Sequence, residues 1–479
     1  MSAIQLAPNL VVSRLVNGLW QIADRERGGV SVDPQEAAHS MLPLVEQGLT
    51  TFDMADHYGS SEEIVGWFRK LYPQKNIQSL TKWVPKPGTI TKQDVREAVT
   101  RALTRLQTEQ IDLMQFHAWN YPDPSWLDGL FYLKELKDEG LILELGVTNF
   151  DSAHLRVALA SGIPLVSNQV CFSLLDQRAA GDMSTLCASH KVKLLAFGTL
   201  AGGFLSDRWL GKPEPILNES LTWSQMKYKR FIDAAGGWQP FQKLLMILNE
   251  VSKRNQTSIA NLATRMMLEE PSVGAVIIGT RLNGHDTWDE NKRILHMSLA
   301  ASDKQEIKEA LKIFTAIPGD CGDEYRKPPF LTASGDLSHH VENFPKPYSI
   351  KPGDIGQEHV MSGTMWEELA GFSRAVKIGN RILISGTTAT HNNQVVGGND
   401  PAAQATFILD KIEGALQTLG ASLQQVVRTR IYLRHVSDWE AVARVHGQRF
   451  RYIQPANTMV RADLIGDEYL VEIEAEAAI

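Results

Sequence analysis

The sequence predicts an α/β protein in which a (β/α)8 TIM barrel is followed by a smaller α+β domain. Over the first three hundred residues, short apolar runs alternate with segments of helical periodicity, which is typical of parallel strands wrapped by helices. This alternation stops near residue 318, where a proline-rich stretch begins, and beyond residue 361 strands come first and long helices follow. A chain of 479 residues is also too long for one ordinary core. We therefore expect a barrel at 1–318, a linker at 319–361 and a second domain at 362–479.

The barrel elements follow in order from apolar runs and helix start signals. Strands are expected at 49–54, 77–84, 111–116, 141–150, 164–175, 192–197 and 274–279. One helix should begin at Asp33, a capping residue followed by proline, and another at Thr91. Further helices are expected at 126–140, 257–270 and 302–314, the last capped by Ser302 and Asp303. The long polar segment 202–239 interrupts the alternation, so it should shape a substrate pocket or lid.

Composition narrows the class of partners. A formal net charge of -7 and a pI near 6.0 give no basic footprint for nucleic acid or for an anionic membrane. The first residues lack the charged start and apolar core of a secretion signal. The three cysteines are scattered without metal spacing, so we interpret them as reduced thiols: Cys171, Cys187 and Cys321. We expect a cytoplasmic protein that binds neither nucleic acid nor membrane.

Four polar residues lie at the ends of three consecutive predicted strands. Asp53 and Tyr58 lie where the first of these strands passes into a helix, and Lys82 and His117 end the next two. In a (β/α)8 barrel, catalytic residues project from this end of the strands. A carbonyl that accepts a hydride needs a proton, which a tyrosine can deliver if a nearby lysine favours its phenolate. The aspartate would hold the ammonium, and the histidine would orient the carbonyl oxygen.

These residues resemble the active-site tetrad of the aldo-keto reductase family. The pattern D-x-A-x-x-Y-G with E-x-x-x-G, the lysine after the third strand and the histidine after the fourth carry the likeness, which runs from about residue 10 to 318. The resemblance implies that Tyr58 donates the proton, supported by Asp53, Lys82 and His117. It also implies an NAD(P)H cofactor held without a Rossmann domain.

The same resemblance implies a set of cofactor-binding residues. Thr148 and Asn149, with Gln169, would bind the nicotinamide carboxamide, while Phe197, beside Gly198 and Leu200, would stack on the ring. The adenine end would be held by a further group: Gly279, Thr280, Arg281, Glu290 and Asn291. Arg281 suits a 2′-phosphate because its guanidinium presents a fork of donors. We therefore expect NADPH, with NADH as the alternative.

The stretch between the domains is rich in proline and contains His339 and His340. A histidine pair invites a metal hypothesis, but no cysteine or acidic cluster accompanies it, so we favour solvated side chains and expect no metal site.

The last 120 residues or so resemble the Rid (reactive intermediate deaminase) family, whose fold is chorismate-mutase-like. The likeness lies in FSRAVKIGNRILISGTTA, GALQTLGASLQQVVRTRIYL and PANTMV followed by LVEIEAEAA. It implies trimers, with pockets between subunits that hydrolyse enamines and imines in active members. Glu472 stands where those enzymes place a glutamate that activates water, or it simply faces solvent or a subunit contact. Asn457 replaces the arginine that binds the substrate carboxylate, and an amide cannot supply that grip.

The sequence thus predicts a reductase of an aldehyde or ketone, with a second domain that assembles it as a homotrimer or binds a small ligand. Two alternatives stay open. The Rid-like domain could hydrolyse an imine whose carbonyl product the barrel reduces, or the barrel could be a module that senses NADPH without turnover.

Overall fold

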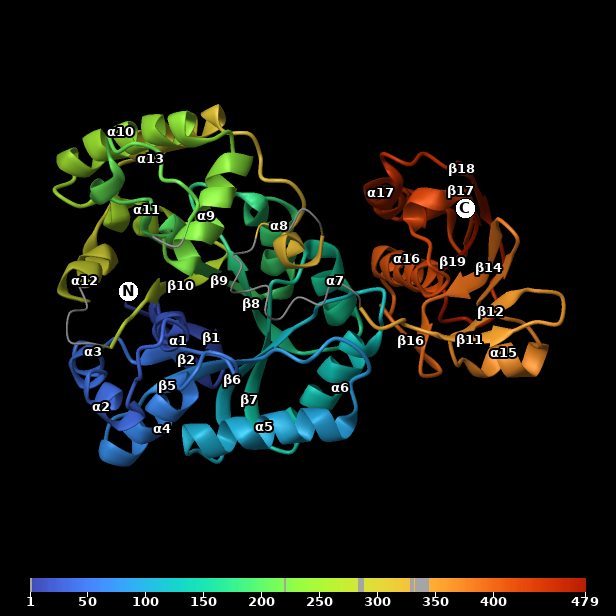
Figure 1. The fold of residues 1–479 in the computed structure, drawn as a ribbon, viewed down its shortest axis with the longest axis horizontal. Coiled ribbons are helices and arrows are strands. Elements are labelled where there is room, and N and C mark those ends of the chain that lie inside the picture. The colour runs from blue at the N-terminus through green and yellow to red at the C-terminus, as the bar shows by residue number, and fades with distance from the viewer. Residues whose placement is uncertain (1, 219–220, 283–287, 328–330, 332–343) are drawn as a thin grey trace.

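A computed structural model describes residues 2–218, 221–282, 288–327, 331 and 344–479. It places the barrel and the C-terminal domain side by side (Figure 1). None of the described helices is long and apolar enough to cross a membrane.

The N-terminal unit is a closed barrel of eight parallel strands. Neighbouring strands follow one another around the ring in chain order, and the last pairs with the first. The strands are β3 (Leu15–Gly18), β4 (Thr51–Asp53), β5 (Gln78–Trp83), β6 (Ile111–His117), β7 (Ile142–Thr148), β8 (Leu165–Cys171), β9 (Lys193–Phe197) and β10 (Val273–Gly279). All carboxyl ends therefore meet at one mouth, as the sequence predicts.

A β-hairpin closes the other end of the barrel. Strands β1 (Ala3–Ala7) and β2 (Leu10–Ser13) pair antiparallel. Buried Leu10 and Val12 belong to the same apolar cluster as Leu80 and Leu113 from the barrel interior. Because side chains fill that end, the functional site lies at the opposite mouth.

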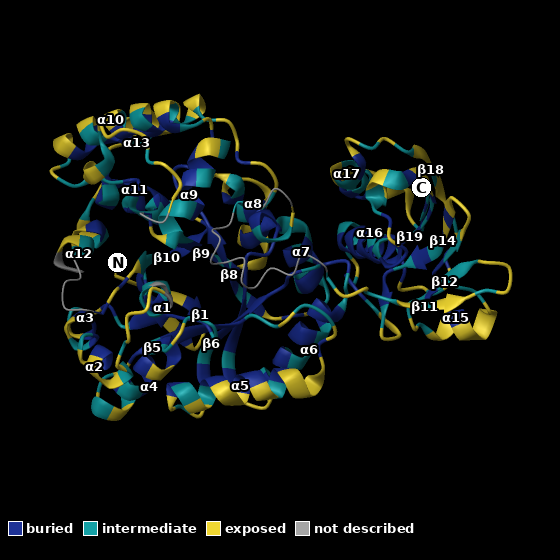
Figure 2. Cartoon of the chain, in the orientation of Figure 1, coloured by how far each residue is buried: buried dark blue, intermediate teal, exposed yellow. Residues whose placement is uncertain are grey.

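The helices that follow the strands wrap the barrel, with their buried faces turned inward and their exposed faces outward (Figures 1 and 2). They are α2 (Pro34–His39), α3 (Leu42–Glu46), α4 (Ser61–Leu71), α5 (Lys92–Leu106), α6 (Ser125–Asp138), α7 (Ser152–Ala160), α8 (Asp182–His190), α11 (Ile259–Leu268), α12 (Trp288–His296) and α13 (Ala301–Ala310). Additional helices are α1 (Trp20–Arg27), the insertion helices α9 (Trp223–Ala234) and α10 (Trp238–Arg254), and α14 (Asp323–Arg326). Short 3-10 turns occur at Arg178–Ala180, Ala201–Gly203, Asp207–Trp209 and Leu311–Ile313.

Two expected helix starts differ in outcome. Thr91 forms a full capping box with Asp94, as expected from its position before the helix. The expected cap at Ser302 and Asp303 is wrong: α13 begins one residue earlier, with Ala300 in the cap position and no side-chain cap bond. Asp303 instead accepts hydrogen bonds from Asn255 and Arg254, which draws it away from the helix terminus.

The C-terminal unit is a mixed sheet with two helices on one face. The sheet order is β11 (Ser349–Pro352), β12 (Glu358–Met361), β13 (Ala375–Ile378), β14 (Arg381–Thr388), β19 (Val471–Ala478), β17 (Val426–Leu433) and β18 (Ala456–Arg461). Helices α16 (Pro401–Thr418) and α17 (Trp439–Phe450) cover it, while α15 (Met365–Ala370) lies at the edge of the domain (Figure 1). A small ribbon, β15 (Thr390–His391) and β16 (Gln394–Val395), and the turns Leu423–Gln425 and Val436–Asp438 complete it.

The structure differs from the expected linker in two places. Residues 349–361 form β11 and β12, which extend the C-terminal sheet instead of leading up to it. Residues 323–326 form α14 and lie at the barrel mouth, where Tyr325 lines the central cavity. Prolines suggested irregular chain, yet Pro352 ends an edge strand, where its missing N–H costs little.

Candidate active site

The barrel mouth holds a cavity of about 840 Å³. The ends of the barrel strands line it, together with residues of α1 and α9 and with Tyr325 of α14. The four tetrad residues, Asp53, Tyr58, Lys82 and His117, all line it. The structure therefore brings together the four side chains that the sequence singles out.

Lys82 is the centre of this cluster. Its Nζ donates to Asp53 Oδ2 at 2.7 Å and to Met54 O at 2.9 Å, and it lies 4.7 Å from the centroid of the Tyr58 ring. Both Lys82 and Asp53 are buried. Burial lowers the pKa of Lys82, and the Asp53 carboxylate opposes that shift. The arrangement places a positive charge beside the phenol of Tyr58.

A pair of glutamines holds the other oxygen of Asp53. Gln169 Nε2 donates to Asp53 Oδ1 at 2.7 Å and to Gln115 Oε1 at 3.0 Å, and Gln115 Nε2 lies 3.3 Å from the same Asp53 oxygen. Gln169, expected at the nicotinamide, thus also fixes the tetrad aspartate. Asn168, its sequence neighbour, turns away and donates to Phe150 O.

Gln115 was not predicted from the sequence. It lies two residues before His117 on β6, and this period-2 spacing is the signal that puts both side chains on the interior face. His117 Nδ1 lies 3.4 Å from Thr148 O, which orients the ring toward the cavity from the neighbouring strand.

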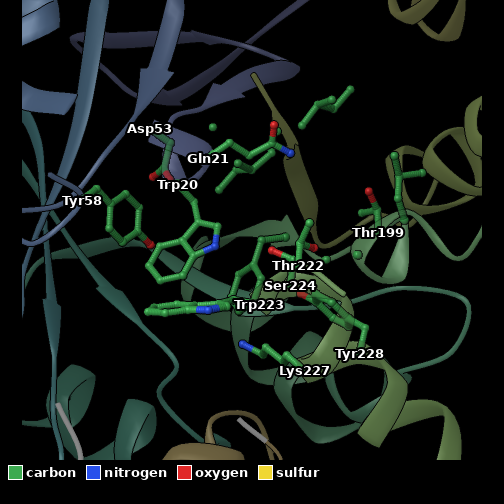
Figure 3. Close-up of a pocket in the computed structure, with 18 of the residues that line it drawn as sticks. Trp20, Gln21, Asp53, Tyr58, Thr199, Thr222, Trp223, Ser224, Lys227 and Tyr228 are labelled. Carbon is green, nitrogen blue, oxygen red and sulfur yellow. The ribbon is translucent and has the colours of Figure 1, made fainter. Parts of the chain in front are cut away.

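Helix α1 forms a wall beside Tyr58. The Trp20 ring lies 4.9 Å from the Tyr58 ring in an edge-to-face arrangement, and Figure 3 shows Trp20, Tyr58 and Trp223 turned toward one another. Glu26 at the far end of α1 accepts from Ser60 N, at the N-terminus of α4. A carboxylate is favourable there because it meets the positive end of the helix dipole. Sequence reasoning missed this wall, since α1 carries no strand-end signal.

The predicted nicotinamide-binding residues gather on one side of the cavity. Thr148, Asn149, Phe197, Gly198 and Leu200 all line it. Among the described residues, Asn149 Oδ1 is a buried acceptor with no hydrogen-bond partner, which fits the NH₂ donor of a carboxamide. These side chains therefore suit the group that the sequence assigns to them.

Gly198 is required by its surroundings. Its φ is +73°, and a Cβ there would lie 2.2 Å from Tyr228 Oη. Burial raises the pKa of Tyr228 well above its ordinary value, so this phenol stays neutral and packs α9 against the strand end.

At the adenine end, the structure brings together Gly279 and Arg281 with two residues of α1. Arg281 Nε donates to Gln21 Oε1 at 3.0 Å, and Arg25 donates to Arg281 O at 3.0 Å. Arg25 also lines the cavity, which sequence reasoning missed.

Three expected adenine-end residues do not line the described cavity. Thr280 is buried behind the strand end, and Glu290 and Asn291 lie in the first turn of α12. Glu290 and Asn291 are separated from Arg281 in the sequence by the segment between β10 and α12. Residues 283–287 of that segment lie outside the described residues.

The insertion 202–239 shapes the pocket, as the sequence predicts. Its α9 supplies Trp223, Lys227 and Tyr228 to the lining, which Figure 3 shows pointing into the cavity from one helix. Lys227 Nζ bonds Tyr325 Oη and lies 5.4 Å from the Phe197 ring centroid.

In the C-terminal domain, the candidate residues Glu472 and Asn457 lie on opposite sides of strand β17 within one chain. Glu472 pairs with Tyr432 on β17, whereas Asn457 pairs with Thr429 from the other side of that strand. Asn457 is exposed and donates to Thr429 Oγ1 at 2.9 Å. Burial raises the pKa of Glu472, an effect that Arg374 partly opposes.

No cluster of three or more possible metal ligands occurs among the described residues. His339 and His340 lie outside them. All three cysteines are free and buried.

Comparisons with known proteins find a family for the barrel and another for the C-terminal domain. Residues 14–312 match the model described as Aldo/keto reductase family, and residues 364–479 match the model described as Endoribonuclease L-PSP, the Rid-type family. The aldo-keto reductase YhdN of Bacillus subtilis is 26% identical over 336 residues, which cover 66% of this chain and 95% of that protein.

Two solved structures are similar to parts of this chain. The structure of the glycerol dehydrogenase of Gluconobacter oxydans is 22% identical in sequence, with a TM-score of 0.53. The match covers 67% of this chain and 98% of the dehydrogenase. A Mycobacterium tuberculosis member of the YjgF/YER057c/UK114 family is 43% identical with a TM-score of 0.24, covering 26% of this chain and 100% of that one. The chain belongs to the aldo/keto reductase family of oxidoreductases and carries a Rid-type domain at its C-terminus.

Proposed function

We propose that this protein is an NAD(P)H-dependent reductase that converts an aldehyde or ketone to an alcohol. The observation that carries the proposal is the position of the Lys82 ammonium, held by Asp53 and 4.7 Å from the Tyr58 ring centroid. A buried ammonium favours the phenolate form, which is what a tyrosine needs in order to give up a proton.

When bound, NAD(P)H supplies the hydride. Tyr58 Oη then delivers a proton to the carbonyl oxygen, and Lys82 stabilises the phenolate left behind. His117 orients the carbonyl oxygen from the adjacent strand end. Asn149 offers its buried Oδ1 to the carboxamide, and Phe197 provides the flat apolar face for the ring.

Two guanidinium groups support a preference for NADPH. Arg25 and Arg281 both line the adenine end and are joined through a hydrogen bond to the Arg281 carbonyl. Arginine is well suited to a phosphate because it can donate two parallel hydrogen bonds. NADH remains the alternative cofactor, because Glu290 and Asn291, which the sequence analysis expects at the adenine end, do not line the described cavity.

The test is oxidation of NADPH and of NADH by the full-length protein against a panel of small aldehydes and ketones. We expect turnover, with NADPH favoured, and a loss of that preference in Arg25→Ala and Arg281→Ala. Tight cofactor binding without turnover of any carbonyl would instead identify a module that senses the cofactor.

We further propose that the C-terminal domain trimerises the protein. The barrel packs on its helical side, so the opposite face of the sheet stays exposed on the single chain (Figure 1). That face carries exposed Leu383 among charged residues such as Arg430 and Glu474, which form an ion pair. An exposed apolar residue beside paired charges suits a subunit contact, in which apolar groups are buried and polar groups lie around them.

A second candidate function, imine hydrolysis in this domain, is supported by Glu472. Its carboxylate is partly buried against Gly386, and its raised pKa suits a residue that exchanges protons with water. Asn457 argues against it, because it lacks the charge that a substrate carboxylate requires. Ammonia release from an imino acid, lost in Glu472→Ala, would establish the activity; its absence in the wild type would exclude it.

A further inference from the structure

A line of buried contacts joins the C-terminal domain to the barrel. Asp410 of α16 accepts a hydrogen bond at 2.9 Å from Nε2 of His154 in the first turn of α7. His154 Nδ1 lies 2.7 Å from Asp151 Oδ1. All three side chains are buried. Burial disfavours a charged imidazole, but the two carboxylates outweigh it and the pKa of His154 is raised. The ring therefore donates from both nitrogens and bridges the domains.

His154 also stacks on Tyr121. The two rings are nearly parallel, 5° apart in orientation, with centroids 3.4 Å apart. The guanidinium carbon of Arg326 lies 4.4 Å from the centroid of the same Tyr121 ring. The tyrosine ring therefore contacts both His154 and Arg326 and connects the two side chains.

Arg326 ties together the ends of two catalytic strands. Its Nε donates to Ala118 O at 2.8 Å and its Nη2 donates to Asn149 O at 2.7 Å. Ala118 directly follows His117, and Asn149 directly follows Thr148. One side chain from beyond the barrel therefore fixes the backbone beside two site residues.

The backbone at Asn149 needs such support. Its φ is +58°, in the left-handed region, which asparagine enters more readily than most non-glycine residues but still at some cost, so the contacts around it help to select this conformation. Asn149 N donates to Gln169 O at 2.8 Å, and Gly322 packs so closely that a Cβ there would lie 1.9 Å from Asn149 O. The direction in which Asn149 presents its amide to the cavity depends on these contacts.

We propose that Asp410 and Arg326 are positioning residues for the nicotinamide-binding side chains of Thr148 and Asn149. In this arrangement the C-terminal domain helps to position the cofactor-binding residues of the reductase site. Asp410 acts through His154 along two routes: through Asp151, two residues after Asn149, and through the Tyr121 ring to Arg326. The inference rests on the proposed function, because it takes the ligand of Asn149 to be the nicotinamide of NAD(P)H.

The test compares two ligands in full-length variants. NADPH carries the nicotinamide, and 2′-phospho-ADP-ribose carries only the adenine end; NADH and ADP-ribose replace them if the wild type prefers NADH. In Asp410→Asn and Arg326→Gln we expect dissociation constants for NADPH raised roughly 3- to 30-fold, with binding of 2′-phospho-ADP-ribose unchanged. Fluorescence titration at a temperature well below unfolding measures both.

Asp128→Asn is the matched control. Asp128 Oδ1 lies 2.8 Å from His391 Nε2 and also accepts from Asn392, so this change breaks an interdomain contact that is separate from the His154 line. It should leave both dissociation constants unchanged even if it lowers the melting temperature. A merely structural role for Asp410 would make Asp410→Asn behave like this control.

Tyr121→Leu keeps the inference testable if Asp410→Asn does not fold, since it removes the stack between His154 and Arg326. Equal effects on the two ligands, or none on either, in every folded variant would overturn the inference. A wild type that binds neither NADPH nor NADH would instead overturn the proposed function.

Discussion

Among single residues, the candidate site is a hydrogen-bonded cluster centred on one aspartate. Asp53 accepts from Lys82 through one oxygen and from Gln169 through the other. Because each partner comes from a different strand, the barrel geometry determines the distances within the cluster.

Lys82→Met should remove catalysis and destabilise the protein. It deletes the cation beside Tyr58 and leaves the Asp53 carboxylate buried without its main partner, which typically costs about 3–5 kcal/mol. We expect kcat to fall by roughly 100-fold or more, the range for losing support of a proton transfer. Steady-state kinetics and thermal unfolding check both effects. Unchanged kcat in a folded Lys82→Met would contradict the role.

The sequence alone predicts the tetrad because Asp53, Lys82 and His117 lie at the carboxyl ends of three consecutive strands and Tyr58 lies in the turn after the first of them. Arg25, Gln115 and Tyr325 escape such reasoning for different reasons. The period-2 spacing of Gln115 places its side chain inside the barrel but does not distinguish it from any other interior residue. Arg25 and Tyr325 reach the site from segments that carry no barrel pattern. Their contribution depends on tertiary packing.

Among the helices and turns, the turn before α4 is the tightest point of the site. Gly59 has a φ of +55°, and a Cβ there would lie 1.8 Å from Glu26 Oε2, the carboxylate that anchors α1. A side chain at Gly59 would therefore displace the Glu26 carboxylate from its contact with Ser60.

Gly59→Ala should displace the Glu26 carboxylate and destabilise the protein. The left-handed backbone alone costs about 1–2 kcal/mol for alanine, and the clash with Glu26 adds to it. Gly48→Ala is the matched control, since Gly48 has a φ of +85° but a Cβ added there would meet no other atom within 4 Å. Chemical denaturation should show a larger loss for Gly59→Ala. Equal losses would mean that the Glu26 contact contributes nothing.

Most elements are predictable because periodicity and caps are local signals, as at Thr91. The misses have physical causes. The sequence does not indicate strand β18, because its residues are mostly exposed at a sheet edge and lack an alternating apolar pattern. Strands β11 and β12 are short and flanked by proline and glycine, which is typical of irregular chain.

Across the whole molecule, the two domains share a buried ionic contact at His154. Its pKa is raised in the folded protein, with the Asp151 and Asp410 carboxylates facing it and Arg449 and Arg326 nearby. A raised pKa means that the charged ring stabilises the fold below the unfolded value near 6.5, and that this contribution is lost as pH rises through the folded value.

His154→Gln should therefore destabilise the protein most at low pH. We expect a difference in unfolding free energy of about 1–3 kcal/mol at pH 6 that shrinks at alkaline pH. Denaturation of both proteins across pH 6 to about 9.5 measures it. A difference that stays constant over this range would show that the ring is not charged in the folded state.

The exposed face of the C-terminal sheet is the proposed contact between subunits of the trimer. Leu383→Glu should convert a trimer to monomers, because it places a charge inside the apolar part of the contact. Leu369→Glu, on exposed α15 at the edge of the domain, is the control and should leave the mass unchanged. Light scattering after size-exclusion chromatography reads the result. A wild type that is already monomeric would contradict the proposal.

The proposed function depends above all on Tyr58, which we propose as the proton donor to the carbonyl oxygen. We would measure NADPH oxidation by the wild type and by Tyr58→Phe against the same carbonyl panel, with NADPH binding followed in parallel. We expect turnover to fall by roughly 100- to 10,000-fold in Tyr58→Phe while the dissociation constant for NADPH is unchanged. Turnover that survives in Tyr58→Phe at the wild-type rate would show that another group supplies the proton.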